Sequence, residues 1–419
     1  MVAVSYQRKE VNLLQQRLCE PPRLLLFIAG PRQVGKTTMV QQVLGQLPPE
    51  QSNFVPVDRP DDTSRTNMTA SASESVDYSF GPRDTRWLVD KWQQARIAAR
   101  QSESGHILVL DEIQKVAQWS ETVKGLWDTD RAEGLNLHVI LLGSSPLLMQ
   151  RGMSESLMGR YELITLTHWS FTEMHGAFGF DLNDYIFFGG YPGAAAYVRD
   201  EPRWKNYVNG SLIAPSIEKD IFEMARVDKP SLLKQLFHLA SAYSGQIVAL
   251  SNMKGQLENA GNETTLADYL ILLENAGLLV GMQKYYRSQI KQRKSPPKHN
   301  VLNNALMTAT SAYSKTEALA DRTYWGRVVE SAVGQHLYNS GKHNDCHLHY
   351  WREGPNEVDF VIERGNRIAA IEVKSGTVPG HAKGLESFEK KFGTCQKHLV
   401  GDGGIPLAEF LSYPAEHWL

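Results

Sequence analysis

The chain has 419 residues, of which 42% are apolar and 21% are charged, and its formal net charge is −2. This composition is that of ordinary globular protein, and the length predicts two or three domains. No run approaches the roughly 20 apolar residues that a membrane helix needs, and the three cysteines are widely separated without metal-ligand spacing. We therefore expect a cytoplasmic protein that does not span a membrane.

The first long apolar run is followed at once by a glycine loop. Residues 1–22 predict a short amphipathic helix, and residues 24–29 predict a buried strand. A second helix with apolar residues on one side begins after the loop. Strand, glycine loop and helix in this order predict a P-loop, because backbone N–H groups at the positive end of a helix can surround phosphates. The predicted ATP site consists of Gly30, Pro31, Arg32, Gln33, Val34, Gly35, Lys36, Thr37 and Thr38.

Two residues of this loop have predicted chemical tasks. Lys36 would reach the β- and γ-phosphates as a catalytic cation, and the Thr37 hydroxyl would ligate Mg²⁺.

The segment after the P-loop helix predicts a strand at residues 53–57, a long loop at residues 59–86 and a helix at residues 87–100.

A second apolar strand, from His106 to Leu110, ends in two acids. We predict that Asp111 binds Mg²⁺ and that Glu112 polarises the attacking water. A neighbouring strand at residues 137–142 ends in Gly143-Ser144-Ser145. Ser144 could sense the γ-phosphate, or this segment could simply start a helix.

Residues 161–166 predict a fifth strand. Five strands with intervening helices predict an α/β fold with a mostly parallel, doubly wound sheet.

At this point the chain resembles a known family. GPRQVGKTT, LVLDEIQKV, LLGSSPLLM and SLMGRYELITL are similar to the ATPase core of a prokaryotic family that joins an AAA-type ATPase to a C-terminal nuclease-like domain of unknown function. FFGGYPGAA and IEKDIFEMARV, at residues 187–195 and 217–227, resemble the segment after that core. Near the end of the middle region the family shows a D-x-G-like element, where this chain has Asn303-Asn304-Ala305.

The resemblance implies an ATPase that uses ATP and Mg²⁺ and assembles with copies of itself, with a hexameric ring favoured. Arg160 or Arg226 would then reach the γ-phosphate of a neighbouring subunit. A structural role for Arg160 is the alternative.

Residues 228–315 predict a winged-helix domain. Three short helices precede a β-ribbon, and residues 264–273 take the recognition position. No acid occurs between Asn275 and Thr316, whereas the segment carries Lys284, Arg287, Lys291, Arg293, Lys294 and Lys298. Such a basic wing could grip the phosphates of DNA, although winged helices also serve as protein–protein modules.

The last hundred residues predict a second chemical site. A helix at residues 326–338 carries Glu330, and a strand follows at residues 348–351. Two further strands meet at the turn Arg364-Gly365-Asn366. Because side chains two apart share a face of a strand, Glu372 and Lys374 should point the same way, with Asp359 on the facing strand.

This order resembles the PD-(D/E)xK nuclease core. The resemblance implies that Asp359 and Glu372 hold Mg²⁺, with Glu330 as a further ligand, and that Lys374 positions or deprotonates a water. Cleavage of DNA and mere binding of DNA both remain open for such a domain.

Four parts are therefore expected. They are a P-loop AAA-type ATPase core at residues 1–175, a helical lid or linker at 176–227, a winged helix at 228–315 and an α/β nuclease-like domain at 316–419. The predicted function is ATP-driven action on branched or foreign DNA, in repair or defence. The alternative is a nucleotide switch in which ATP gates assembly with a partner. Stimulation of ATP turnover by DNA distinguishes the two.

Overall fold

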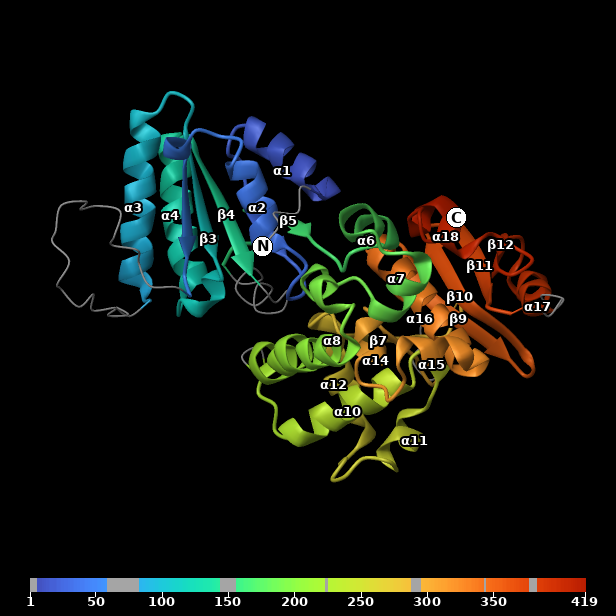
Figure 1. Ribbon diagram of the computed structural model, residues 1–419. Helices are drawn as coiled ribbons and strands as arrows, with labels where there is room; N and C mark the ends of the chain where they lie inside the picture. Colours follow the sequence, from blue (N-terminus) through green and yellow to red (C-terminus); the bar gives the residue numbers. More distant parts are fainter. Residues whose placement is uncertain are drawn as a thin grey trace. The chain divides into compact units, whose positions relative to one another are not determined.

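The computed structural model describes residues 6–58, 83–143, 156–222, 225–287, 295–342, 344–376 and 383–419 (Figure 1). These residues form two compact units. The N-terminal unit comprises residues 7–30 and 35–166, and the C-terminal unit comprises Tyr6 with residues 31–34 and 167–419. No helix among the described residues is long and apolar enough to cross a membrane.

A five-stranded parallel sheet forms the centre of the N-terminal unit. Its strand order is β2-β3-β4-β1-β5, and all four neighbouring pairs are parallel. The predicted strands are confirmed as β1 (Leu25–Ala29), β2 (Ser52–Pro56), β3 (His106–Asp111), β4 (Leu137–Gly143) and β5 (Tyr161–Thr165). β1, β3 and β4 are buried along their whole length, which explains why they appear in the sequence as continuous apolar runs.

Helices cover both faces of this sheet. They are α1 (Lys9–Cys19), α2 (Lys36–Leu44), α3 (Thr85–Gln101) and α4 (Trp119–Glu133). Figure 1 shows α1 and α2 on the side of the sheet opposite to α3 and α4. Trp92 from α3 and Trp127 from α4 pack with Phe27 and Leu108 of the strands in one apolar core. The doubly wound arrangement that the sequence predicts is thus present in this unit.

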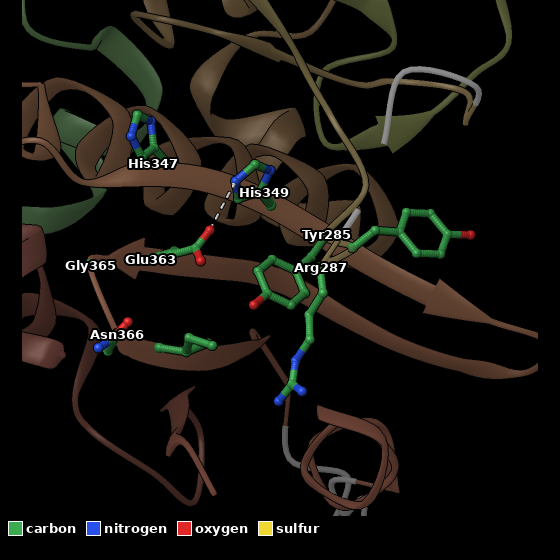
Figure 2. A pocket seen from close by; sticks show the side chains of 9 residues that line it. Tyr285, Arg287, His347, His349, Glu363, Gly365 and Asn366 are labelled. Atoms are coloured by element: carbon green, nitrogen blue, oxygen red, sulfur yellow. Dashed lines mark ion pairs between the residues drawn. The ribbon is translucent and has the colours of Figure 1, made fainter. Parts of the chain in front are cut away.

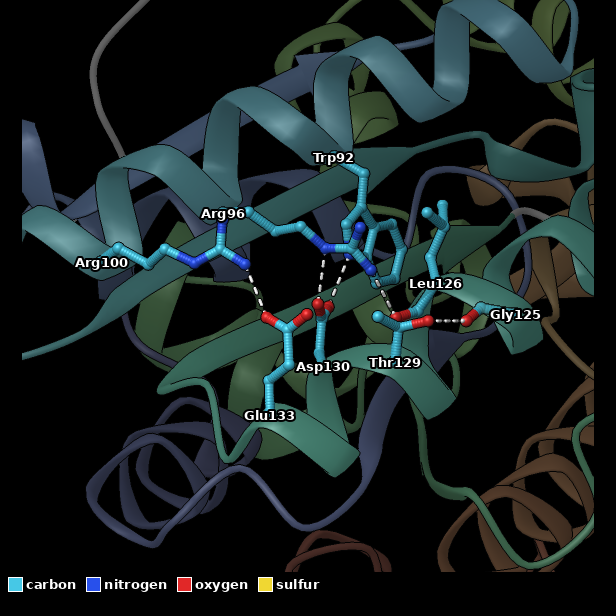
Figure 3. A network of polar contacts seen from close by, with 8 residues as sticks. All are labelled: Trp92, Arg96, Arg100, Gly125, Leu126, Thr129, Asp130 and Glu133. Atoms are coloured by element: carbon cyan, nitrogen blue, oxygen red, sulfur yellow. Dashed lines mark hydrogen bonds and ion pairs between the residues drawn. The ribbon is translucent and has the colours of Figure 1, made fainter.

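A buried polar network joins α3 to α4 (Figure 3). Arg96 Nε lies 2.5 Å from Asp130 Oδ1, and Trp92 Nε1 donates a hydrogen bond of 2.7 Å to Asp130 Oδ2. The Asp130 side chain is only 2% exposed. Its burial raises the pKa of the Asp130 carboxyl, while the Trp92 hydrogen bond and the Arg96 charge act in the opposite direction. Near the ends of the same helices, Arg100 and Glu133 form an exposed pair.

The C-terminal unit begins with helical segments. These are α6 (Phe171–Phe178), α7 (Leu182–Phe188) and α8 (Glu201–Tyr207), and α8 is followed by π-helical turns at Val208–Ile213 and Ser216–Ile221.

Three helices and a small antiparallel sheet follow. The three helices precede a β-ribbon as the sequence predicts, whereas the short strand at Gln246–Ile247, between the first two helices, was not predicted. The elements are α10 (Pro230–Ala242), β6 (Gln246–Ile247), α11 (Leu250–Lys254), α12 (Glu263–Asn275), β7 (Leu279–Met282) and β8 (Lys298–Val301). The sheet order is β6-β8-β7, so β8 is the central strand. The predicted wing residues Lys291, Arg293 and Lys294 lie outside the described residues.

A four-stranded sheet lies near the end of the chain. It has the order β12-β11-β10-β9, formed by β9 (His347–Glu353), β10 (Asn356–Arg364), β11 (Arg367–Lys374) and β12 (Gln396–Gly401). The predicted hairpin is confirmed, because β10 and β11 are antiparallel with Arg364 opposite Arg367. Gly365 in the turn has φ 58°, a conformation that favours glycine. The helices of this region are α14 (Ala305–Thr308), α15 (Lys315–Ala320), α16 (Arg322–Gly341), α17 (Lys383–Phe392) and α18 (Leu407–Phe410).

Buried hydrogen bonds connect the small sheet and its flanking segments to α16. Ser244 and Ser331 hydroxyls are 2.7 Å apart, and Asn304 Nδ2 donates to the Val328 carbonyl at 2.8 Å. Asn303, which stands near the position of the family's missing acid, accepts a hydrogen bond of 3.0 Å from Gly190 N–H. Because Asn303 and Asn304 are fully buried, these amides hold backbone segments together. The predicted borders at residues 227 and 315 both fall inside this one compact unit.

Candidate active site

The glycine loop turns into α2 at Gly35. This residue has φ 93°, and a side chain there would meet no atom within 4 Å, so the left-handed backbone is what favours glycine. Lys36, the first residue of α2, is 7% exposed, and its Nζ donates a hydrogen bond of 2.9 Å to the Gly30 carbonyl. The Lys36 ammonium group at one end of the loop therefore contacts the Gly30 carbonyl at the other end. The sequence predicts phosphate oxygens at this position.

Thr37 and Asp111 meet at the carboxyl end of β3. Thr37 Oγ1 donates a hydrogen bond of 2.9 Å to Asp111 Oδ2. Burial raises the pKa of the Asp111 carboxyl, and the Thr37 hydrogen bond opposes this shift. A hydroxyl and a carboxylate brought together supply the oxygen ligands that Mg²⁺ prefers. These two residues fit the predicted metal ion of the ATP site.

Glu112 has an unusual backbone. Its φ is 61° and its ψ is 41°, in the left-handed region that non-glycine residues rarely adopt. Such a conformation costs on the order of 1–3 kcal/mol and is concentrated at functional sites. The Glu112 carboxylate accepts a hydrogen bond from the Gln114 side chain, two residues further on.

Residues 31–34 of the glycine loop group with the C-terminal unit. Within that unit, the Arg32 guanidinium donates two hydrogen bonds to the two carboxylate oxygens of Asp220. Trp169 Nε1 donates to the Val34 carbonyl at 2.9 Å. Asp220 is 5% exposed and was missed by the sequence reasoning. The available signal was its place in IEKDIFEMARV, a segment that the family resemblance singles out.

The candidate arginine fingers have intramolecular partners. Arg160 Nε lies 2.7 Å from Asp128 Oδ1, and its Nη2 donates to Asp128 Oδ2 at 3.1 Å. This bidentate pair is the contact that a structural role for Arg160 requires. Arg226 pairs with Asp228 at 3.1 Å, with both side chains exposed. Ser144 lies outside the described residues.

The predicted C-terminal residues are brought close together, but not as an open metal site. Asp359 Oδ2 accepts a hydrogen bond of 2.8 Å from the Val373 backbone N–H. Lys374 Nζ lies 2.6 Å from Glu372 Oε1, which confirms that these two side chains share one face of β11. One oxygen of Asp359 and one oxygen of Glu372 therefore have protein partners, whereas Glu372 Oε2 is buried without a hydrogen-bond partner among the described residues.

Lys298 adds a fourth charged group that the sequence assigned to the wing. This expectation was wrong, because the Lys298 side chain is 0% exposed and cannot contact phosphates. Its Nζ forms an ion pair with Glu330 Oε1, lies 3.7 Å from Asp359 Oδ1 and donates to the Asp359 backbone carbonyl at 3.1 Å. Burial raises the pKa of Glu330 to about 7, against the effect of Lys298.

We call Lys298, Glu330, Asp359, Glu372 and Lys374 the acidic cluster. Among the residues that the structure describes, no group of three His, Cys, Asp or Glu residues is arranged to hold a metal ion. The cluster as it stands does not fit the divalent cation that the nuclease resemblance implies, because an ammonium group lies between two of its carboxylates.

A cavity of about 520 Å³ opens elsewhere in the C-terminal unit (Figure 2). Its lining residues include two tyrosines, two histidines and one arginine, and the set is Tyr285, Tyr286, Arg287, His347, His349, Glu363, Gly365, Asn366 and Ile368. His349 Nε2 lies 4.0 Å from Glu363 Oε2. Burial lowers the pKa of His349 to about 4, so the imidazole is neutral at pH 7. The cavity shares β10 with the acidic cluster but contains none of its residues.

Comparisons with known proteins divide the chain into three matched segments. Residues 22–175 match an AAA domain, residues 179–317 match a domain of unknown function (DUF8612) and residues 325–408 match a second domain of unknown function (DUF4143). No curated protein matches the chain.

Solved structures give distant matches. The Walker-type ATPase PABY2304 of Pyrococcus abyssi is 14% identical with a TM-score of 0.50, and the match covers 74% of this chain and 99% of that one. The Aeropyrum pernix ORC1 protein in complex with DNA is 13% identical (75% and 95% covered, TM-score 0.30). The Thermotoga maritima RuvB Holliday junction branch migration motor is 17% identical (65% and 88% covered, TM-score 0.32). Identities this low restrict any inference to the fold. The TM-scores of 0.30 and 0.32 support no inference, so only the match to PABY2304 is used.

Proposed function

We propose that this chain, in which residues 22–175 are an AAA-type P-loop ATPase domain, hydrolyses ATP and uses the reaction to act on DNA, such as branched or foreign DNA. The observation that carries the ATPase part is the hydrogen bond between Thr37 and Asp111, 2.9 Å long, beside a buried Lys36. Lys36 and Thr37 come from the start of α2, and Asp111 comes from the carboxyl end of β3, as a P-loop site requires.

Each residue has a distinct task in this proposal. Lys36 exchanges its bond to the Gly30 carbonyl for oxygens of the β- and γ-phosphates, and N–H groups at the start of α2 bind the same anion. Thr37 and Asp111 would hold Mg²⁺, which would supply positive charge against the phosphates. Glu112 orients a water for attack on the γ-phosphorus and accepts its proton.

Action on DNA is supported by the middle of the C-terminal unit. The succession α10, β6, α11, α12, β7 and β8 is the order of elements in a winged helix. The segment between β7 and β8 carries Lys284, Arg287, Lys291, Arg293 and Lys294 and no acid. We propose that this segment contacts phosphates, and that the C-terminal sheet contributes binding. We do not propose cleavage, because the acidic cluster does not fit a divalent cation.

DNA is expected to raise the rate of ATP turnover, and the basic segment should set the salt dependence of DNA binding. Replacing Arg293 and Lys294 with Ala should weaken binding and reduce the slope of log affinity against log salt by about two, roughly one per lost phosphate contact. The measurement is fluorescence anisotropy with single-stranded, duplex and branched DNA over a salt series, alongside ATPase assays. A control variant removes Lys9 and Arg86, two exposed cations of the N-terminal unit, and should keep the wild-type slope. An equal slope in both variants would contradict a wing contact.

A protein partner is the second candidate target, in which case ATP gates an assembly. The observation that favours it is the exposed side of α12, the helix in the recognition position. Its exposed side chains are Glu263, Thr264, Asp268 and Ile271, and α12 contains no Lys or Arg. Two carboxylates in that position would repel phosphates. An ATPase rate that no form of DNA changes would favour this candidate.

We also propose that copies of the chain assemble, with a hexameric ring favoured, and that Arg160 acts on the nucleotide of a neighbour. The matched variants are Arg160→Ala and Asp128→Asn, since both break the same exposed pair but only the first removes the guanidinium. Arg160→Ala should lose most ATP turnover, and Asp128→Asn should keep it. Light scattering with ATP and Mg²⁺ reports the assembly. Equal turnover in the two variants, or a monomer under all these conditions, would overturn this part of the proposal.

A further inference from the structure

We propose that Lys298 takes the place of the divalent cation in the acidic cluster, so that the protein itself supplies the cation between Glu330 and Asp359, and this nuclease-like site binds no Mg²⁺ or Mn²⁺ while Lys298 is present. The inference concerns a site that the ATPase proposal does not use.

The position of the ammonium group is the first argument. Lys298 Nζ contacts Glu330 Oε1 and donates to the Asp359 backbone carbonyl at 3.1 Å, with Asp359 Oδ1 at 3.7 Å. A metal ion bound by both carboxylates would need oxygens at about 2.0–2.6 Å from a single point. The ammonium group lies between these two carboxylates, so a metal ion bound by both of them would have to displace it.

The charges within the cluster also favour Lys298 over a dication. The acidic cluster holds three carboxylates, Glu330, Asp359 and Glu372, and two ammonium groups, Lys298 and Lys374. Glu372 and Lys374 form their own pair, so Lys298 is the one cation beside the two remaining acids, Glu330 and Asp359. With all five groups ionised, three carboxylates and two ammonium groups give the cluster a formal charge of −1. A dication added to this arrangement would leave an excess of buried positive charge, which is unfavourable.

The third argument is that Lys298 is fixed from its backbone outward. It begins β8, the central strand of its sheet, and it stands opposite Ile247 of β6 and Met282 of β7. Its Nζ lies 4.8 Å from the centroid of the Phe360 ring, a distance at which a cation and an aromatic face attract each other. The ammonium group cannot leave the cluster by a simple rotation into solvent, since the side chain is wholly buried.

The origin of Lys298 matters as well. It belongs to the segment matched by DUF8612, whereas Glu330, Asp359 and Glu372 belong to the segment matched by DUF4143. The residue that closes the site therefore comes from outside the nuclease-like segment. A comparison of the nuclease-type residues alone would find all three acids and would miss Lys298, the cation that contacts two of them.

The test measures binding of Mn²⁺ alone to the full chain, without nucleotide, by the loss of the electron paramagnetic resonance signal of free Mn²⁺. Wild type should bind no more Mn²⁺ than Asp359→Asn or Glu372→Gln. Lys298→Met removes the charge but keeps the length of the side chain. It leaves two acids without a cation, so it should gain one Mn²⁺ per chain with affinity at least about tenfold above any wild-type binding. Lys298→Met/Asp359→Asn should lose this gain.

Lys315→Met serves as the control, because Lys315 is another lysine of the C-terminal unit that pairs with a carboxylate, Asp184 at 2.6 Å, outside the acidic cluster. It should gain no Mn²⁺. The proposal is overturned if wild type binds an Mn²⁺ that Asp359→Asn lacks, or if a folded Lys298→Met gains none. Should Lys298→Met not fold, refolding it with MnCl₂ should restore the native circular dichroism. The comparison of wild type with Asp359→Asn and Glu372→Gln tests, without any change at Lys298, whether the acidic cluster binds a metal ion.

Discussion

Lys36→Ala is expected to lower ATP turnover by roughly 100- to 1000-fold or more, and to weaken binding of the triphosphate strongly. The physical reason is that a preorganised cationic donor acts where negative charge develops, and removal of one such donor typically costs this much. In the structure the Lys36 ammonium is 7% exposed and already held across the loop by the Gly30 carbonyl. Steady-state ATPase assays and titration with a fluorescent ATP analogue measure the two effects separately.

Glu112→Gln is the control that separates chemistry from binding. This variant keeps the side-chain volume and every cation of the loop, so it should bind ATP as tightly as wild type while its turnover falls. Wild-type turnover in Glu112→Gln would remove Glu112 from its proposed role as base. Wild-type turnover in Lys36→Ala would contradict the assignment of the nucleotide site itself.

Arg96→Met is expected to destabilise the N-terminal unit by about 3–5 kcal/mol. Its partner Asp130 is 2% exposed and would be left as a buried carboxylate without a cation, the arrangement for which losses of this size are typical. The Trp92 indole would still donate to Asp130 (Figure 3), so the loss should fall toward the lower part of that range. Hydrogen exchange of the β3 and β4 amides in the full chain reports the free energy of opening this unit.

Arg100→Ala is the matched control for the Arg96 prediction. Arg100 lies one turn further along α3 and pairs with Glu133 at 2.5 Å, but the two side chains are 52% and 47% exposed. Such exposed pairs contribute about 0–1 kcal/mol. If the two variants lower the hydrogen-exchange protection of β3 and β4 equally, burial does not explain how much the Arg96–Asp130 pair contributes to stability.

Local pattern was enough to predict the strands of the parallel sheet and the hairpin near the end of the chain. β1, β3 and β4 are buried on both faces, and burial of that kind leaves an unbroken apolar run in the sequence. The β10–β11 hairpin was recognisable because a glycine turn joins two apolar stretches, and the turn then fixes which residues face each other.

The partners of the charged residues could not be predicted in the same way. Lys298 stands among other basic residues in the sequence, and nothing local distinguishes it from a solvated wing residue. Its partner Asp359 is 61 positions away, and the partner of Arg32 is 188 positions away. Such pairs are decided by how whole segments pack, and neither hydrophobic period nor turn chemistry records that packing. The carboxylate Asp359 could therefore be predicted from its place in a motif, whereas Lys298, the cation beside it, could not.

The place of β1 in the sheet has a consequence for synthesis of the chain. β1 is the first of the five strands to be made, yet its neighbours are β4 and β5, which pair Leu26 with Ile140 and Leu25 with Tyr161. At translation rates of about 5–20 residues per second, the apolar β1 segment waits on the order of ten seconds for either neighbour to leave the ribosome. During that time the β1 segment is unpaired, apolar and prone to aggregation. Chains whose synthesis stops before β5 would keep this segment exposed. Co-expression of chaperones should therefore raise the yield of this protein more than stabilising substitutions in α3 or α4.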